Sequence, residues 1–173
     1  HGSYNRRAFP IQPGPNVSPA QFPNTRLRRT RQAAFIRDMV RETHLAPEHL
    51  IQPLFVAEGA LAGPVASMPG VNRLTLEALV DECRALAAVG IRLVALFPVI
   101  PAEQKTDDGR EALNPQGLVP RAIKAIKAAV PELGIMCDVA LDPFTTHGHD
   151  GLLDARGNVD NDATVEILRR QAL

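Results

Sequence analysis

The chain is poor in the residues that mark secreted and membrane-embedded proteins. It has two cysteines among 173 residues, which is too few for a disulfide framework. No apolar run approaches the roughly 20 residues that a membrane-spanning helix requires, and no secretory signal is visible. We therefore expect a cytoplasmic protein with no membrane partner. A 45% hydrophobic content is enough for one ordinary domain with a sizeable core.

The chain also lacks net charge, because 19 Lys and Arg balance 19 Asp and Glu, but the charges are unevenly spread. Residues 1–42 hold eight arginines against Asp38 and Glu42. A basic arm of this kind can bind nucleic acid, or it can wrap an acidic neighbouring subunit. The arm has no lysine-rich run and no nucleic-acid motif. We therefore predict a subunit contact and no nucleic acid.

Composition divides the chain into three parts. Residues 1–3 read as the remnant of an expression tag. Residues 4–45 form an arm that is rich in proline at first, with a helix predicted over residues 30–43. Residues 46–173 carry alternating strand and helix patterns. The predicted strands are 50–56, 93–99 and 135–142, and the predicted helices are 75–90, 118–130 and a last one capped by Asn161 or Asp162.

The fold class that this order predicts is α/β. The strands are apolar throughout, as in a parallel sheet whose two faces are covered by helices. Successive strands begin about 40 residues apart, so a barrel of eight such units needs well over 300 residues, within the range of TIM barrels with insertions. Three strands alone would leave long apolar edges, which soluble proteins avoid.

The stretch richest in ionisable side chains is residues 138–151, DVALDPFTTHGHDG. Its first five residues read as the end of the third strand, with Asp138, Ala140 and Asp142 on one face. Extended backbone separates the Cα atoms of Asp138 and Asp142 by roughly 13 Å. Asp150 can return to Asp142, because two glycines permit sharp turns in this loop. The carboxylates either cap loop amides at the strand end or line a site.

The two histidines of this stretch are weak candidates for a metal site. His147 and His149 have a spacing that is common by chance, and the thiolates that favour zinc are missing. Cys83 and Cys137 fall on apolar faces and read as small buried hydrophobic side chains. We expect no zinc.

Seven segments together resemble the porphobilinogen synthase (5-aminolevulinate dehydratase) family, over the N-terminal half of its members. They are residues 25–29 (TRLRR), 50–56 (LIQPLFV), 67–73 (SMPGVNR), 96–99 (LFPV), 114–117 (NPQG), 131–134 (PELG) and 138–151. The resemblance implies about three βα units of a TIM (β/α)₈ barrel, preceded by an arm that embraces a neighbouring subunit in a homo-octamer. It implies condensation of two 5-aminolevulinate molecules, with loss of two waters, to porphobilinogen in haem biosynthesis.

The resemblance also implies what this chain lacks. Members of the family form Schiff bases between their substrates and two lysines, and neither lysine has a counterpart here. Lys105, Lys124 and Lys127 occupy other positions, Lys105 in a loop at the catalytic face. We therefore expect a fragment, or the ordered part, of a longer enzyme, and we predict that these 173 residues alone form no porphobilinogen.

The metal chemistry departs from that of the zinc-type members, which carry three cysteines where this chain has Ala140, Asp142 and Asp150. Carboxylate oxygens suit hydrated Mg²⁺ or a monovalent cation rather than zinc. The chain thus resembles the zinc-independent, aspartate-type branch. Asp142 and Asp150 either hold a weakly bound hydrated cation or act directly on cationic intermediates. Asp138 resembles the family's active-site aspartate, which orients the substrate amine or relays protons, so Asp138 and Asp142 are the catalytic candidates.

Two other functions remain as alternatives. The arm could make the chain a non-enzymatic interaction module that docks on an acidic or nucleic-acid partner. The rest of the chain could instead be a small α/β metal-dependent hydrolase with ligands among Asp142, His147, His149 and Asp150. In the dehydratase interpretation, His147 and Thr145 support the loop and take no direct part in the chemistry.

Overall fold

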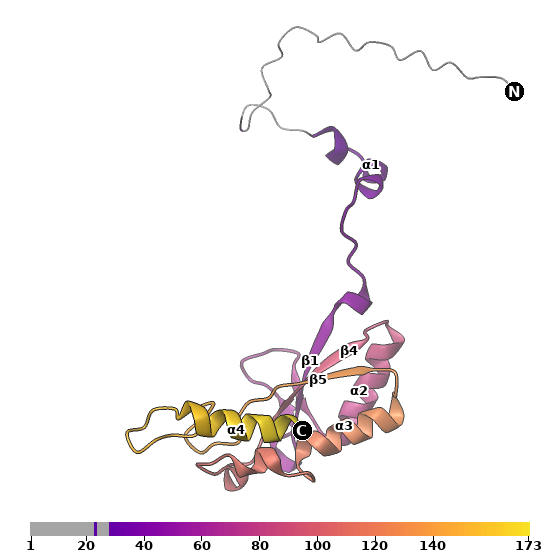
Figure 1. Cartoon of the computed structure of the whole chain (residues 1–173). Coiled ribbons are helices and arrows are strands. Elements are labelled where there is room, and N and C mark those ends of the chain that lie inside the picture. The colour runs from indigo at the N-terminus through magenta and orange to yellow at the C-terminus, as the bar shows by residue number, and fades with distance from the viewer. Residues whose placement is uncertain (1–22, 24–27) are drawn as a thin grey trace, which may run out of the picture. The chain divides into compact units, whose positions relative to one another are not determined.

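The computed structural model describes residue 23 and residues 28–173, which fall into two units, residues 1–44 and residues 45–173. In the second unit, helices pack on a five-stranded sheet (Figure 1). The tag remnant predicted at residues 1–3 and the proline-rich start of the predicted arm lie outside the described residues. No helix in the described part of the chain is long and apolar enough to cross a membrane.

The first unit contains a 3₁₀ turn over Arg29–Arg31 and helix α1 over Ala34–Met39. The prediction of one helix over residues 30–43 is therefore wrong in its extent. No residue of α1 is buried, and the side chains of Phe35 and Met39 are 69% and 82% exposed. A helix of six residues has few of the internal hydrogen bonds that stabilise longer helices, and such short helices are marginal in water.

The sheet of the second unit has the strand order β2-β3-β1-β4-β5. Its strands are β1 (Ile51–Val56), β2 (Gly63–Pro64), β3 (Asn72–Leu74), β4 (Leu93–Pro98) and β5 (Gly134–Cys137). Strands β3, β1, β4 and β5 run parallel, and β2 is antiparallel to β3. The carboxyl ends of the parallel strands therefore meet at one edge, which is where α/β enzymes hold their chemistry.

Strand β1 accommodates a proline near the middle of the sheet. Pro53 lies opposite Ala95 of β4, but β3 pairs with β1 through Phe55 and Val56 alone. No β3 residue therefore pairs with Pro53, which has no N–H to donate. The sequence pattern did not predict β2 and β3, because strands of two and three residues are too short to show a period.

The three helices of the second unit are α2 (Leu76–Ala88), α3 (Leu118–Ala129) and α4 (Asn161–Ala172). Thr75 caps α2 as predicted, because its Oγ1 accepts the Ala78 N–H at 3.2 Å, and Gly90 follows the helix with φ of +95°. The cap of α4 is Asp160, which accepts the Ala163 N–H at 3.1 Å and precedes the predicted cap positions.

The core lies between α2, α3 and the sheet. Side chains that are less than 2% exposed there include Val56, Leu79, Cys83, Val94, Leu96, Ile126 and Leu133. Burying each large apolar side chain contributes about 1.5–3 kcal/mol. Burial raises the pKa of the Cys83 thiol to about 11, so this cysteine is a packed apolar group, as its place in the helix pattern predicts.

Strand β5 ends at Cys137, five residues before the predicted end at Asp142. Its pairing with β4 stops where Leu96 lies opposite Cys137. The chain then turns, and the Leu141 carbonyl accepts from the N–H groups of Phe144 and Thr145 at 2.8 and 3.0 Å. The prediction that side chains alternate between the two faces of a strand is therefore wrong beyond Cys137.

Candidate active site

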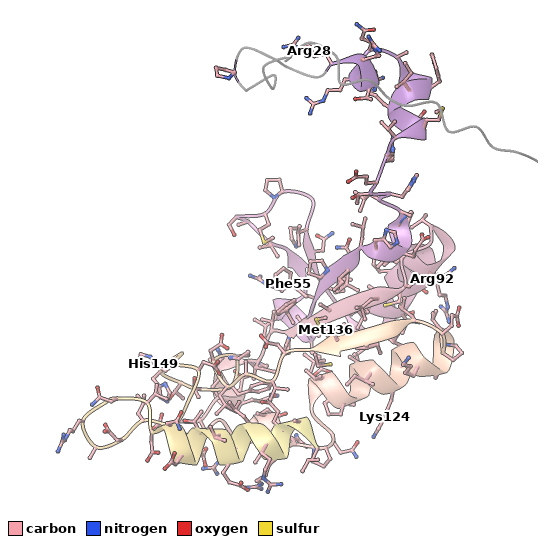
Figure 2. The ribbon with its side chains drawn as sticks, turned by 45° about the horizontal axis from the view of Figure 1, so that its top comes forward. Arg28, Phe55, Arg92, Lys124, Met136 and His149 are labelled. Atoms are coloured by element: carbon pink, nitrogen blue, oxygen red, sulfur yellow. The ribbon has the colours of Figure 1, made fainter. Side chains whose placement is uncertain are left out.

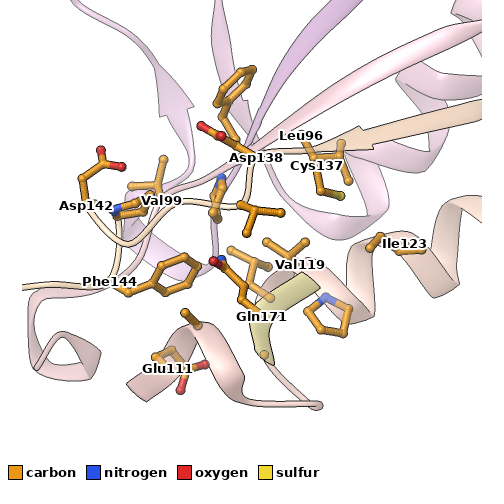
Figure 3. A pocket seen from close by; sticks show the side chains of 18 of the residues that line it. Leu96, Val99, Glu111, Val119, Ile123, Cys137, Asp138, Asp142, Phe144 and Gln171 are labelled. Atoms are coloured by element: carbon orange, nitrogen blue, oxygen red, sulfur yellow. The ribbon is translucent and has the colours of Figure 1, made fainter. Parts of the chain in front are cut away.

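A cavity of about 530 Å³ opens at the carboxyl ends of β4 and β5. Its walls come from both strands, from the start of α3 and from the end of α4 (Figure 3). The apolar part of the lining includes Leu96, Val99, Val119, Ile123 and Phe144, and the polar part includes Lys105, Glu111, Asp138, Asp142 and Gln171. An apolar pocket with a few converging polar groups is the usual form of a small-molecule site.

Asp138 and Asp142 both reach this cavity, although they do not share the face of a strand as predicted. Asp138 directly follows β5, and Asp142 lies on the loop beyond it (Figure 3). Ala140, which was predicted to share their face, is 6% exposed, and its neighbour Leu141 is fully buried. Within the described part of the chain, neither carboxylate makes a hydrogen bond to another residue. Both are therefore available to a ligand, and the loop-capping interpretation does not hold for them.

Asp150 does cap a loop amide. Its Oδ1 accepts the Leu141 N–H at 2.6 Å, which brings the end of the loop back to its start. Burial raises the pKa of Asp142 above the ordinary value of a carboxyl, and the charges of Asp150 and Asp138 raise it further. The three carboxylates therefore interact electrostatically, as the predicted return of the loop requires.

Residues 138–151 are called the carboxylate loop below. Gly148 supplies the left-handed turn of this loop with φ of +72°. Gly151 serves a different purpose, because a Cβ atom there would lie 2.5 Å from Val159 Cγ1 and 2.8 Å from Thr164 Oγ1. Gly151 is thus required for close approach to the start of α4.

The histidines and Thr145 hold the carboxylate loop together. Thr145 is 1% exposed, and its Oγ1 donates to the His149 carbonyl at 2.9 Å. His147 Nδ1 accepts the His149 N–H at 3.2 Å, and His147 Nε2 lies 3.1 Å from the Asp107 carbonyl. Both ring nitrogens of His147 therefore have a partner within the protein.

The described residues contain no group of three or more His, Cys, Asp or Glu side chains arranged to hold a metal ion. The hydrolase alternative therefore has no complete ligand set there. A cation at Asp142 and Asp150 would have to take most of its ligands from water or from other groups.

Two residues of the site were not predicted from the sequence. Gln171 of α4 donates from Nε2 to the Ala140 carbonyl at 3.1 Å and lines the cavity, and its Oε1 is buried without a partner. Glu111, which precedes α3 in the chain, accepts from Asn114 Nδ2 at 3.0 Å and also lines the cavity. Neither belongs to a recognisable motif, and a single glutamine in a helix gives no signal that it faces a cavity.

Lys105 and Lys124 lie as their positions predict, whereas Lys127 is held by backbone carbonyls. Lys105 lines the cavity. Among the described residues, it is the one Lys or Arg side chain that lines it. Lys124 is exposed on α3 and points away from the sheet (Figure 2). Lys127 donates to the Leu133 carbonyl at 2.6 Å and so ties the end of α3 to β5.

An ion pair joins the residue Glu58, which follows β1, to helix α3. Arg121 of α3 donates from both terminal nitrogens to the two oxygens of Glu58, each at 2.8 Å. The Arg121 guanidinium lowers the pKa of the Glu58 carboxyl. A two-point contact of this kind fixes direction as well as distance, so it locks the residues after β1 to the first turn of α3.

The family model of delta-aminolevulinic acid dehydratase matches residues 24–173. The chain belongs to this family. It is 47% identical to the delta-aminolevulinic acid dehydratase of Bradyrhizobium diazoefficiens, over 92% of this chain and 45% of the relative. It is 45% identical to the chloroplastic dehydratase of Selaginella martensii, over 92% of this chain and 38% of the relative.

A solved dehydratase shows the same fold. The delta-aminolevulinic acid dehydratase (porphobilinogen synthase) of Toxoplasma gondii, in complex with the reaction product porphobilinogen, superposes with a TM-score of 0.82 and 42% identity, over 89% of this chain and 43% of that chain. The predicted fold class is therefore confirmed: this α/β chain is the N-terminal part of a TIM barrel. The chain spans less than half the length of these dehydratases.

Proposed function

We propose that this chain supplies the first part of the barrel of a porphobilinogen synthase, which condenses two molecules of 5-aminolevulinate to porphobilinogen. The observation that carries the proposal is the pair Asp138 and Asp142, two carboxylates that line one cavity and make no hydrogen bond to another of the described residues, in a chain of the dehydratase family. The reaction serves tetrapyrrole biosynthesis. We propose that the enzyme carries it out in the cytoplasm.

The two carboxylates suit this condensation for an electrostatic reason. Joining an amine to a ketone carbonyl passes through a positively charged imine, which nearby carboxylates stabilise. Asp138, directly after β5, is proposed to orient the substrate amine and relay its proton. The raised pKa of Asp142 brings this carboxyl closer to the pH at which proton transfer is efficient.

The Schiff-base lysines that the reaction needs are proposed to come from outside this chain. Lys124 is exposed and Lys127 is bonded to a backbone carbonyl, so neither is placed to meet a substrate. The 173 residues alone are accordingly proposed to form no porphobilinogen.

A hydrated cation, Mg²⁺ or a monovalent ion, is proposed near Asp142 and Asp150. The donor set consists of carboxylate oxygens, which suit a hard cation that keeps several waters. Asp150 Oδ1 already accepts the Leu141 N–H, which leaves its second oxygen as the less encumbered ligand. This set does not suit zinc, which prefers sulfur and nitrogen ligands.

The arm is proposed to join subunits of a homo-oligomer, an octamer. The support is the apolar surface of α1, where Phe35 and Met39 are 69% and 82% exposed. A neighbouring subunit that covers these side chains would remove their apolar surface from water.

The experiment is an activity assay on a hybrid dehydratase, in which residues 24–173 of this chain are joined to the C-terminal part of the Bradyrhizobium diazoefficiens dehydratase. We expect porphobilinogen formation by the hybrid, and a fall in kcat of about 10²-fold or more in Asp138→Asn and Asp142→Asn, the range of a lost general acid or base. Asp81→Asn, an exposed position on α2, is the matched control. Wild-type kcat in both site variants would remove the two carboxylates from the mechanism.

A further inference from the structure

The loop that follows β4 is joined to the carboxylate loop by main-chain hydrogen bonds. The Thr106 N–H donates to the Phe144 carbonyl at 3.1 Å, and the Thr106 carbonyl accepts the Thr146 N–H at 3.3 Å. This is the pattern of a short parallel bridge. Two loops that leave neighbouring strands are thereby held at a fixed spacing beyond the end of the sheet.

Asp107, in the loop that follows β4, makes two contacts with Thr146 and His147 of the carboxylate loop. Its Oδ1 accepts from the Thr146 hydroxyl, and its carbonyl lies 3.1 Å from His147 Nε2. His147 Nδ1 accepts the His149 N–H, so the ring proton is on Nε2 and is donated to Asp107. Asp107 thus holds two consecutive residues on the stretch that returns to Asp150.

The loop that follows β4 is also held by hydrogen bonds among its own side chains. The Thr106 hydroxyl donates to Asp108 at 2.6 Å, and Arg110 Nε donates to the same carboxylate oxygen at 3.1 Å. Gly109 has φ of +59°, and a Cβ atom there would lie 3.5 Å from Leu141 Cδ2. The loop therefore packs closely against Leu141, whose N–H is bonded to Asp150.

We propose that Asp107 is a positioning residue for the carboxylates of the dehydratase site. Asp107 is not among the described residues that line the cavity, so it acts through the loop that it holds. The Asp107 carboxylate holds the Thr146 hydroxyl, whereas His147 is held by the Asp107 backbone carbonyl, which any substitution keeps. Loss of the carboxylate therefore frees Thr146 at the start of the segment leading to Asp150, and we expect it to loosen the bond between Asp150 and the Leu141 N–H. The role rests on the proposed function, because the carboxylates need fixed positions only if they meet a reacting substrate.

The first measurement is amide hydrogen exchange on the 173-residue chain, which does not depend on activity. In Asp107→Ala we expect the Leu141 amide to exchange about tenfold faster, the factor that corresponds to one ordinary hydrogen bond, while the core amide of Val94 is unchanged. Thr146→Val removes the hydroxyl donor and should have the same effect. Asp107→Asn keeps an acceptor oxygen and should restore slow exchange, and Glu103→Ala, an exposed acid before the same loop, is the control.

The second measurement is kcat and KM in the hybrid dehydratase. Asp107→Ala should lower kcat about tenfold or more with little change in KM, since small displacements of catalytic groups cost more than their contact energy, and Asp107→Asn should retain most of the activity. Unchanged Leu141 exchange in Asp107→Ala, or unchanged kcat, would overturn the proposal. If the unsubstituted hybrid is inactive, the proposed function fails, and the exchange rates alone decide whether Asp107 holds the loop.

Discussion

Substitution of Gly151 by alanine should destabilise the chain through steric overlap alone. Gly151 does not have a positive φ, so its backbone conformation is open to any residue. The added Cβ would lie 2.5 Å from Val159 Cγ1 and 2.8 Å from Thr164 Oγ1. Val159 is 49% exposed and can move aside, but Thr164 is 5% exposed. The Thr164 hydroxyl also donates to the Asp160 carbonyl at 2.6 Å and accepts the Leu152 N–H at 2.9 Å.

The magnitude follows from the contact with Thr164. Overpacking a well-packed site costs about 1–3 kcal/mol, and rotation of the Thr164 hydroxyl away from Leu152 costs about 1 kcal/mol more. Alanine restricts the unfolded chain and offsets roughly 0.4–1 kcal/mol. The net loss should be about 1–3.5 kcal/mol, a large part of the roughly 5–15 kcal/mol that stabilises a domain.

Urea unfolding of the 173-residue chain, followed by circular dichroism, measures this loss as a lower midpoint at constant slope. Adding Val159→Ala removes the shorter contact but leaves the Thr164 contact, so the double variant should recover less than half of the loss. A Gly151→Ala chain within about 0.5 kcal/mol of the wild type would refute the reasoning, because the start of α4 could then move away freely.

Two further changes test the charges of the site. The pKa of Asp142 is raised in the folded chain by burial and then by Asp150 and Asp138, so its contribution is most favourable at acid pH and is lost as pH rises through the folded-state pKa. Asp142→Asn should therefore be more stable than the wild type at pH 7. Because Asp142 is only partly buried and water screens its charge, the gain should be under about 1 kcal/mol, and it should vanish toward acid pH in parallel urea titrations. Arg121→Met should lower the free energy of unfolding by about 1 kcal/mol, the value of a partly exposed two-point ion pair. Adding Glu58→Gln should lower it little further, because the pair is already broken. Fully additive losses in this double-mutant cycle would contradict a direct coupling.

Local chemistry explains which elements of the fold could be predicted from the sequence. Helix α2 begins after Thr75 and ends before Gly90, as predicted, because caps depend on residues within one turn. The apolar run of β4 is equally local. The end of β5 was placed too late, because an alternating pattern does not reveal that the Leu141 carbonyl will turn back to Phe144 and Thr145.

The sequence indicated Asp138 and Asp142, which line the cavity, but not Gln171 and Glu111 or the contacts that hold the loop. The carboxylate loop was recognised because its ionisable side chains are close together in the sequence. The contacts that hold it come from distant positions: Thr146 and Asp107 are 39 residues apart, and Gln171 and Ala140 are 31 apart. A single sequence has no period or motif that reports such pairs, since they arise only when the fold brings distant segments together.

The parallel pairing of β1, β4 and β5 also sets when the cavity can form during folding. Each pairing closes a chain segment of a few dozen residues before it gains a single contact, which makes this kind of topology slow to fold. The bond between Thr106 and Phe144 joins loops that follow two of these strands, so we expect it to form after the strands have paired. Substitutions in the loops should accordingly leave the refolding rate unchanged and speed unfolding.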